Sequence, residues 1–329
     1  MTLPRRDFMT GLSVASSLGS AAVASAGPFV RPKRRMHVLL GAPEGSVADT
    51  AARAFMEYLA PRLIGADIAL TNIPGDAGRA MLAALGDANP DGTTIGWVVT
   101  PTLQARIIDR SEPSLGQRIR LLGQIEREPI AFVSPSKDPA NTIQDIIRRA
   151  SDDADAVPLG TPPAGSSPHL AALRLQVLAQ TQLNIVTFPS SAAARQAVLD
   201  ANVSAAALGL SGVIGDLREG NLSAIGIAAR RRFGLLPDTP VLDEGGIPLS
   251  AFIRRGIGVP VATPPDVTNP MIDAIHAAAT DNAFDDQAEV GGYYAAWADG
   301  AAWLTQIQTE QAALAELWET NPWLSSSGG

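Results

Sequence analysis

The sequence predicts an α/β fold in which parallel strands alternate with helices that cover both faces of the sheets. Short apolar runs, bounded by Gly, Pro or polar residues, recur along most of the 329-residue chain, and helical patterns stand between them. Strands separated by helices in this way favour parallel sheets. With 46% hydrophobic and 18% charged residues, the chain can bury one large core or two smaller ones.

The first part of the chain follows this alternation closely. Apolar runs predict strands at residues 37–40, 67–71, 94–99 and 130–133. Helices are predicted at residues 51–63 and 79–85. In the first of these helices Phe55, Leu59 and Leu63 recur at a spacing of four residues, so they form one apolar face that we expect to pack on a sheet.

The middle of the chain repeats the pattern, and the last third becomes mainly helical. Strands are predicted at residues 156–160, 184–187, 204–208 and 224–227, with a helix at 168–179 between the first two. Two further helices are predicted at residues 270–282 and 300–318. The apolar side of the last helix is expected to pack on the core.

The first 26 residues have the three parts of a secretory signal peptide. A charged start, residues 4–9 (PRRDFM), precedes an apolar stretch rich in Ala, Ser and Gly, and Ala24-Ser25-Ala26 provides a small-residue cleavage site. The adjacent Arg5 and Arg6 resemble a twin-arginine signal. We therefore expect export to the periplasm with cleavage near Ala26. A membrane anchor is the alternative, but the apolar stretch is shorter than the roughly 20 residues that span a bilayer.

The composition excludes several classes of chemistry. The chain has no Cys, which excludes disulfides, a thiolate nucleophile and Cys-ligated metal sites. Its three histidines are far apart in the sequence, so neither a metal site nor any other cofactor is predicted. The net charge of −8 disfavours a nucleic-acid partner. No segment after the signal is long and apolar enough to embed the protein in a membrane.

Two strand–turn–helix junctions carry the functional prediction. In the first, residues 39–49 (LLGAPEGSVAD), Ser46 and Asp49 have the spacing of a capping box. In the second, residues 159–169 (LGTPPAGSSPH), Ser167 is expected to be the N-cap and Pro168 the first helical residue. Each junction offers free backbone N–H groups at the positive end of a helix dipole, which suits an anion. If the two junctions face each other across a cleft, together they would form one anion-binding site.

Other interpretations of these junctions stay open. Any α/β protein has several capped helices, so a single such turn can be purely structural. Neither turn has a dinucleotide-binding or P-loop pattern, and no G-x-S-x-G elbow is present. A hydrolase with Ser166 or Ser167 as nucleophile and His169 as base is an alternative, although residues so close at a helix start are poorly placed to pair.

Five short motifs resemble one family, the periplasmic solute receptors of tripartite tricarboxylate transporters, also called the Bug or TctC family. The motifs occur in the family's order and the resemblance extends from about residue 31 to 320. They are residues 43–49 (PEGSVAD), 72–78 (NIPGDAG), 90–94 (PDGTT), 165–170 (GSSPHL) and 236–248 (LPDTPVLDEGGIP).

The resemblance implies a two-lobed binding protein of the type II, Venus-flytrap class, in which each lobe is a mixed sheet flanked by helices. The chain would cross between the lobes twice, near residues 125–129 and 251–256. The first lobe would then comprise residues 31–126 and 253–329, and the second lobe residues 127–252.

The resemblance also implies that the two turns hold a carboxylate of the ligand through backbone N–H groups, hydroxyl side chains and ordered water. On the first lobe the matching residues are Pro43, Gly45, Ser46 and Asp49, with Thr100 and Thr102 after the next strand. On the second lobe they are Gly165, Ser166, Ser167 and His169, with Ser190 and Ser191 at a further helix start.

The chain departs from the family pattern at three places. Glu44 replaces a small residue, and its carboxylate is unfavourable beside an anion unless it points away or meets a donor on the ligand. Leu208-Gly209 stands where many relatives have Asp-Asn, so a polar contact to the distal part of the ligand would be missing. Arg254 and Arg255 stand where an aromatic residue is usual. They are either solvated hinge residues, or one of them, Arg255, grips a second carboxylate.

The sequence therefore predicts a receptor and not an enzyme. It is expected to be a periplasmic monomer that closes around a small organic carboxylate and delivers it to the integral membrane subunits of a tripartite transporter. An orphan ligand sensor of the same fold is the nearest alternative, and a hydrolase that uses Ser167 and His169 is the other.

Overall fold

The computed structural model describes residues 34–136 and 142–324. The predicted signal peptide, residues 1–26, with its cleavage site near Ala26, lies outside the described residues. The chain from Lys33 onward forms one compact unit. Within the described ranges, no helix is long and apolar enough to cross a membrane.

The first sheet combines a parallel part with three antiparallel strands. Its strands are β2 (Ala66–Asn72), β1 (Arg34–Leu40), β3 (Thr94–Thr100), β9 (Phe252–Pro260), β4 (Ile119–Pro135) and β10 (Tyr294–Asp299), in that spatial order. The pairs β1–β2 and β1–β3 are parallel. The pairs β3–β9, β4–β9 and β4–β10 are antiparallel.

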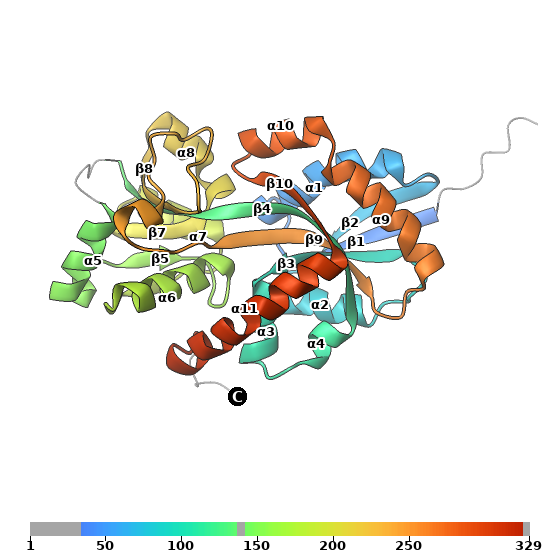
Figure 1. Ribbon diagram of the computed structural model, residues 1–329, viewed down its shortest axis with the longest axis horizontal. Coiled ribbons are helices and arrows are strands. Elements are labelled where there is room, and N and C mark those ends of the chain that lie inside the picture. Colours follow the sequence, from blue (N-terminus) through green and yellow to red (C-terminus); the bar gives the residue numbers. More distant parts are fainter. Residues whose placement is uncertain (1–33, 137–141, 325–329) are drawn as a thin grey trace, which may run out of the picture. The chain divides into compact units, whose positions relative to one another are not determined.

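The second sheet begins at the far end of β4. Residues 119–129 of that strand pair with β9, whereas residues 130–135 pair with strands of the second sheet. These strands are β5 (Leu159–Thr161), β6 (Ile185–Thr187), β7 (Ala205–Gly209) and β8 (Leu222–Ala228). Figure 1 shows β4 and β9 running side by side between the two groups of elements.

The sheets are therefore mixed, as the family resemblance implies, and not purely parallel, as the alternation alone predicts. The strand predicted at residues 130–133 is the end of the 17-residue β4, and β9 and β10 were not predicted. Buried ionic residues interrupt the apolar pattern of the crossing strands: Glu126 and Glu128 on β4, and Arg255 on β9. A strand with charged residues at inward positions lacks the alternation of apolar and polar residues from which a strand is predicted.

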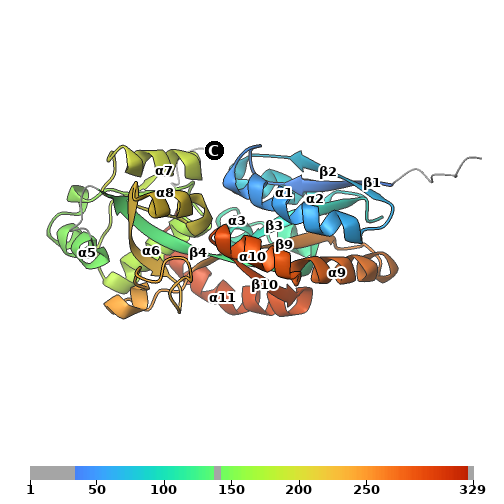
Figure 2. The same cartoon turned by 90° about the horizontal axis from the view of Figure 1, so that it is seen from above.

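Helices cover both faces of each sheet (Figures 1 and 2). The first sheet lies between α1 (Val47–Leu59), α9 (Pro265–Ala279) and α10 (Asn282–Val290) on one face, and α2 (Arg79–Gly86), α3 (Thr102–Asp109), α4 (Ser114–Gln117) and α11 (Gly300–Thr320) on the other. The second sheet lies between α5 (Ile143–Asp152) and α6 (Ser167–Ala179) on one face, and α7 (Ser191–Leu199) and α8 (Ile214–Glu219) on the other.

The two helices that follow the predicted junctions start slightly earlier than expected. Helix α1 begins at Val47, and Ser46 is its N-cap, accepting from the Asp49 N–H at 3.2 Å. In a capping box the Asp49 carboxylate would accept from the N–H of the cap residue, Ser46. Here it accepts from the Gly45 N–H instead. Helix α6 is capped by Ser166 rather than Ser167, so Pro168 is its second residue, where a missing N–H is equally harmless.

Candidate functional site

A cavity of about 340 Å³ lies where elements of both sheets meet. The first sheet contributes the ends of β1 and β3 with the starts of α1 and α3, and the second contributes the starts of α6 and α7. The crossing strands supply Glu128, Ile253 and Arg255. Parallel sheets bind ligands beyond the carboxyl ends of their strands, and the ends of β1 and β3 are such a place.

Four helices begin at this cavity, and the first two residues of each one line it. These residues are Val47 and Ala48 of α1, Thr102 and Leu103 of α3, Ser167 and Pro168 of α6, and Ser191 and Ala192 of α7. The first amide groups of a helix have no acceptor within the helix. The convergence therefore surrounds the cavity with backbone donors and with the positive ends of four helix dipoles.

Serine caps keep these donors available. Ser46, Ser166 and Ser190 each accept from the N–H of the third helical residue, at 3.2, 3.5 and 3.1 Å. The caps leave the first two amides of α1 and of α7 without a partner among the residues that the structure describes. In α6 only the Ser167 N–H is left in this way, because the second residue, Pro168, has no N–H. A ligand with several acceptor oxygens can therefore bond to them without breaking an existing hydrogen bond.

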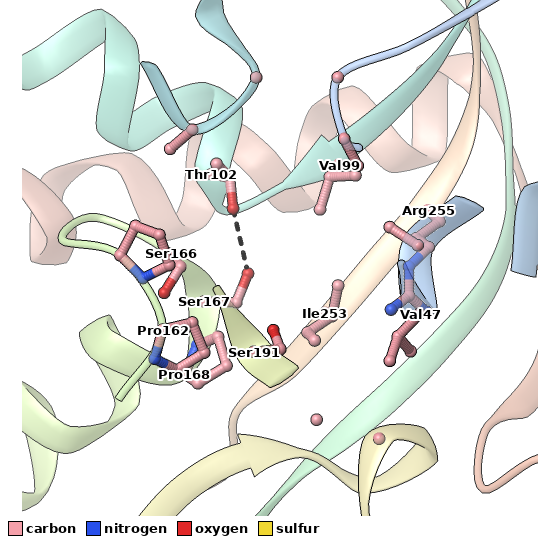
Figure 3. Close-up of a pocket in the computed structure, with 18 of the residues that line it drawn as sticks. Val47, Val99, Thr102, Pro162, Ser166, Ser167, Pro168, Ser191, Ile253 and Arg255 are labelled. Carbon is pink, nitrogen blue, oxygen red and sulfur yellow. Dashed lines mark hydrogen bonds between the residues drawn. The ribbon is translucent and has the colours of Figure 1, made fainter. Parts of the chain in front are cut away.

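Hydroxyl groups add to the donors on one side of the cavity. Figure 3 shows Thr102, Ser166, Ser167 and Ser191 gathered there, with Val47, Val99 and Arg255 on the opposite side and Ile253 between the two groups, beside Ser191. The Thr102 Oγ1 and Ser167 Oγ atoms lie 3.4 Å apart, so a residue of the first sheet group meets a residue of the second at this point. Hydroxyls rotate freely and both can donate to a carboxylate.

Asp49 organises the turn before α1 and lies outside the cavity lining. Its buried carboxylate accepts from the Gly45 N–H, Asn72 Nδ2 and Arg53 Nε, each within 2.9 Å. The hydrogen bond from Arg53 is the main cause that lowers the pKa of Asp49 to about 2. The neighbouring Glu44 side chain is 83% exposed and lies 3.8 Å from Arg53, so it points away from the cavity.

Arg255 lines the cavity but is held by two carboxylates. It is 3% exposed, and its Nη1 donates to Glu126 Oε1 at 2.6 Å while its Nη2 donates to Glu128 Oε2. Glu128 Oε1 also accepts from the Ser211 N–H and hydroxyl, at 2.8 and 2.6 Å. Burial raises the pKa of Glu126 above its usual range. Both terminal nitrogens of this guanidinium therefore donate to carboxylates of the chain before any ligand arrives, and its Nε is buried without a hydrogen-bond partner.

The other arginines of the region are also paired. Arg195 on α7 lines the cavity and donates from Nε and Nη2 to Asp216, at 2.5 and 2.7 Å. Arg254 points away from the cavity lining and forms two hydrogen bonds to Glu310, at 3.2 and 2.9 Å. A ligand carboxylate would have to compete with these internal partners for either guanidinium.

His169 is not placed to act as a base on a serine. The ring is buried, and its Nδ1 accepts from the Gly165 N–H at 3.4 Å. Burial, with Arg106 nearby, lowers the pKa of His169 to about 4, so the ring is neutral near pH 7. No hydroxyl hydrogen-bonds to this ring in the described part of the chain. The arrangement lacks the nucleophile–base contact that a hydrolase needs.

The structure divides the predicted site residues into two groups. The residues that line the cavity are Thr102, Ser166, Ser167, Ser191 and Arg255. The residues that lie outside the lining are Pro43, Gly45, Ser46, Asp49, Thr100, Gly165, His169 and Ser190. Three residues of the second group have structural roles. Ser46 and Ser190 cap helices, and the Thr100 hydroxyl accepts a hydrogen bond from the buried Trp303 Nε1 at 3.1 Å.

Several lining residues were not predicted. The largest share is apolar and includes Leu40, Val47, Met81, Leu82, Val99 and Ile253. Of the polar ones, Arg195 follows Ser191 by four residues, a spacing that places both on the same face of α7. That spacing was available from the sequence once α7 was assigned. In the described ranges, no group of three or more His, Asp or Glu side chains could hold a metal ion.

Solved structures share this fold. The periplasmic binding protein BugD matches with a TM-score of 0.77 and 21% identity, over 88% of this chain and 98% of that one. MatC from Rhodopseudomonas palustris, solved with bound malate, matches with a TM-score of 0.74 and 22% identity over 86% and 98%. A further R. palustris protein, solved with adipate, matches with a TM-score of 0.79 and 18% identity over 87% and 97%.

The sequence comparisons identify the family. A UPF0065 protein of Bordetella bronchiseptica is 25% identical over 72% of this chain and 70% of its own length. The protein BugT of Bordetella pertussis is 23% identical over 75% and 76%. The model of the tripartite tricarboxylate transporter family receptors matches residues 51–315. Because that match covers most of the chain, this protein belongs to the tripartite tricarboxylate transporter receptor family.

Proposed function

We propose that this chain binds a small organic carboxylate in the cavity and acts as a receptor without catalysis. The observation that carries the proposal is the convergence of four helix N-termini, whose unpartnered amides lie beside four hydroxyl groups. Hydrogen bonds from amides to a carboxylate are charge-assisted and about twice as strong as neutral ones.

The comparisons support this choice of ligand. MatC was solved with malate and the other R. palustris protein with adipate, and both are carboxylates. The geometry of His169 favours binding over acyl transfer, because its Nδ1 already accepts from a backbone N–H.

The first experiment measures thermal unfolding of ligand-stripped protein against a panel of monocarboxylates and dicarboxylates. A ligand that binds only the folded state, at a concentration 100-fold above its Kd, adds about 2.7 kcal/mol to the free energy of unfolding. We expect a clear rise in Tm for at least one carboxylate. If no member of a broad panel raises the Tm, the proposal is wrong.

A double variant tests whether the hydroxyls take part. Ser167→Ala with Ser191→Ala removes two cavity hydroxyls and keeps the caps Ser166 and Ser190, so we expect Kd to rise about tenfold from two lost hydrogen bonds. Ser151→Ala is the matched control, because Ser151 is exposed on α5, away from the cavity. Equal affinity of the double variant and the control would contradict this assignment.

We also propose the lobe boundaries, the cellular location and the transport partner that the family resemblance implies. The lobes comprise residues 31–126 with 253–329, and residues 127–252. The change of partners along β4 after Pro129 supports a crossing at this point. The receptor is exported to the periplasm and passes its ligand to a tripartite membrane permease. Uptake of the labelled ligand by cells that lack the receptor gene tests delivery: uptake should fall, and unchanged uptake would argue for a sensor.

A further inference from the structure

We infer that the ligand is a monocarboxylate with an apolar body, and that dicarboxylates are disfavoured. This inference rests on the proposed function, because it names the class of carboxylate that the same cavity accepts. Three properties of the cavity lead to it: the apolar wall, the pairing of every lining cation, and the tight packing at the end of β7.

Apart from the ion-paired Arg255, the wall opposite the hydroxyl groups is apolar. Val99 of β3 lies there in Figure 3, and Ile253 of β9 lies between this wall and Ser191. Met81, Leu82 and Leu208 line the cavity as well. An apolar group of the ligand that contacts this wall leaves water at a gain of about 25 cal/mol per Å² of buried surface. A charged group at the same place loses its hydration without a replacement.

Each lining cation already has its charge balanced by a carboxylate of the chain. Arg255 and Arg195 are the cations that the cavity exposes among the described residues, and both donate two hydrogen bonds to carboxylates of the chain. Around Arg255, two glutamates meet one guanidinium, so this cluster has no net positive charge whether Glu126 is protonated or ionised. A second ligand carboxylate would approach Glu128, a lining residue, and like charges repel.

At Gly209, the packing leaves no room for a polar side chain that could bind a second carboxylate in place of Arg195 or Arg255. A Cβ atom at Gly209 would lie 2.3 Å from Glu128 Oε1 and 2.9 Å from Ile253 Cδ1. The preceding residue, Leu208, contributes an apolar side chain to the lining. The polar side chains of the lining that are not already held in an ion pair are therefore concentrated on the side of the four hydroxyls.

The test uses three compounds with the same six-carbon chain: hexan-1-ol, hexanoate and adipate. Their affinities for ligand-stripped protein are measured by calorimetry at one salt concentration. We expect hexanoate to bind about tenfold tighter than adipate, or more, because the second carboxylate of adipate is desolvated without a partner. Hexan-1-ol should bind more weakly than hexanoate, because its single neutral oxygen accepts weaker hydrogen bonds from the amides and hydroxyls than a carboxylate does.

The outcomes separate this inference from the proposed function. If adipate binds as tightly as hexanoate or tighter, the inference is overturned, while carboxylate binding stands. If hexanoate shows no binding and another carboxylate does, the inference is again overturned alone. If hexan-1-ol binds as tightly as hexanoate, the carboxylate site itself is wrong, and both fail.

A variant of the apolar wall tests the same inference independently, through the ratio of the affinities for hexanoate and adipate. Val99→Thr keeps the shape of a β-branched residue and puts a hydroxyl on the apolar wall, opposite Arg255 in the register of β3 and β9. We expect it to reduce the preference for hexanoate over adipate severalfold. Val261→Thr is the matched control, because Val261 is 45% exposed and outside the cavity. An unchanged preference in Val99→Thr would count against an apolar wall that selects the ligand.

Discussion

Replacing Asp49 by Asn tests how the first turn is held in place. The carboxylate connects the turn, through Gly45, to Arg53 one helical turn later and to Asn72 at the end of β2. Asn has nearly the same shape but no charge, and its Nδ2 cannot accept the hydrogen bonds that Asp49 Oδ2 accepts from Gly45 and Arg53. The variant therefore removes charge-assisted bonds and keeps the volume.

The size of the effect follows from the pKa of Asp49. That pKa is lowered from 3.8 to about 2, mainly by the hydrogen bond from Arg53. A tenfold change in proton affinity corresponds to about 1.36 kcal/mol, so the charged form contributes roughly 2 kcal/mol to the free energy of unfolding. Because the folded pKa is depressed, this contribution is complete well above pH 3.8 and is lost as the pH falls toward 2.

Urea unfolding of the wild type and Asp49→Asn at several pH values measures this contribution. The variant should be less stable by roughly 2 kcal/mol from about pH 5 to 7, and the difference should narrow below about pH 4. Asp273→Asn is the control, since Asp273 is exposed on α9, and it should change stability by no more than about 0.5 kcal/mol. A difference for Asp49→Asn that stays constant from neutral pH down to about pH 3 would refute the electrostatic argument.

Two further predictions concern the second turn and the N-terminal segment. Gly165 and Gly45 have φ values of +74° and +73°, but a Cβ at Gly165 would lie 1.7 Å from Arg106 Nη2, whereas one at Gly45 meets nothing within 4 Å. Gly165→Ala should therefore lower the free energy of unfolding by more than Gly45→Ala, for which backbone strain alone costs about 1 kcal/mol. Equal decreases in the free energy of unfolding, measured with urea, would contradict this prediction. Replacing Arg5 and Arg6 together by Lys should abolish appearance of the protein in the periplasmic fraction, while a matched double Arg-to-Lys change in the first strand should not. Continued export would show that the segment is not a twin-arginine signal.

The sequence predicted α1 and α6, two of the four helices that begin at the cavity, because their signals are local. Serine before a helix, a Gly/Pro turn and a short apolar strand are each encoded within a few residues, and α1 and α6 start within four residues of their predicted positions. The choice between Ser166 and Ser167 as the cap of α6 was beyond sequence reasoning. Either serine can accept from an N–H two or three residues later, and only the backbone geometry decides.

The wall of the cavity could not be predicted in the same way. It is built where β3, β4 and β9 lie beside one another, although these strands are far apart in the sequence. The register places Arg255 opposite Val99 on one side and Glu126 on the other. The sequence shows a charged Arg255 near a predicted crossing, but it does not show that two glutamates already occupy that guanidinium. Pairing across a sheet of this kind is a property of the tertiary structure.

The position of the crossing strands has a consequence for how binding and conformation are linked. Strand β4 takes part in both sheets and pairs with β9 in the first, and these two strands also supply Glu128, Ile253 and Arg255 to the cavity. Any change in the angle between the sheets must bend the ladder that these strands form, and a molecule in the cavity touches that ladder directly. Occupancy and angle are therefore thermodynamically coupled, because a ligand stabilises whichever angle gives it the better contacts.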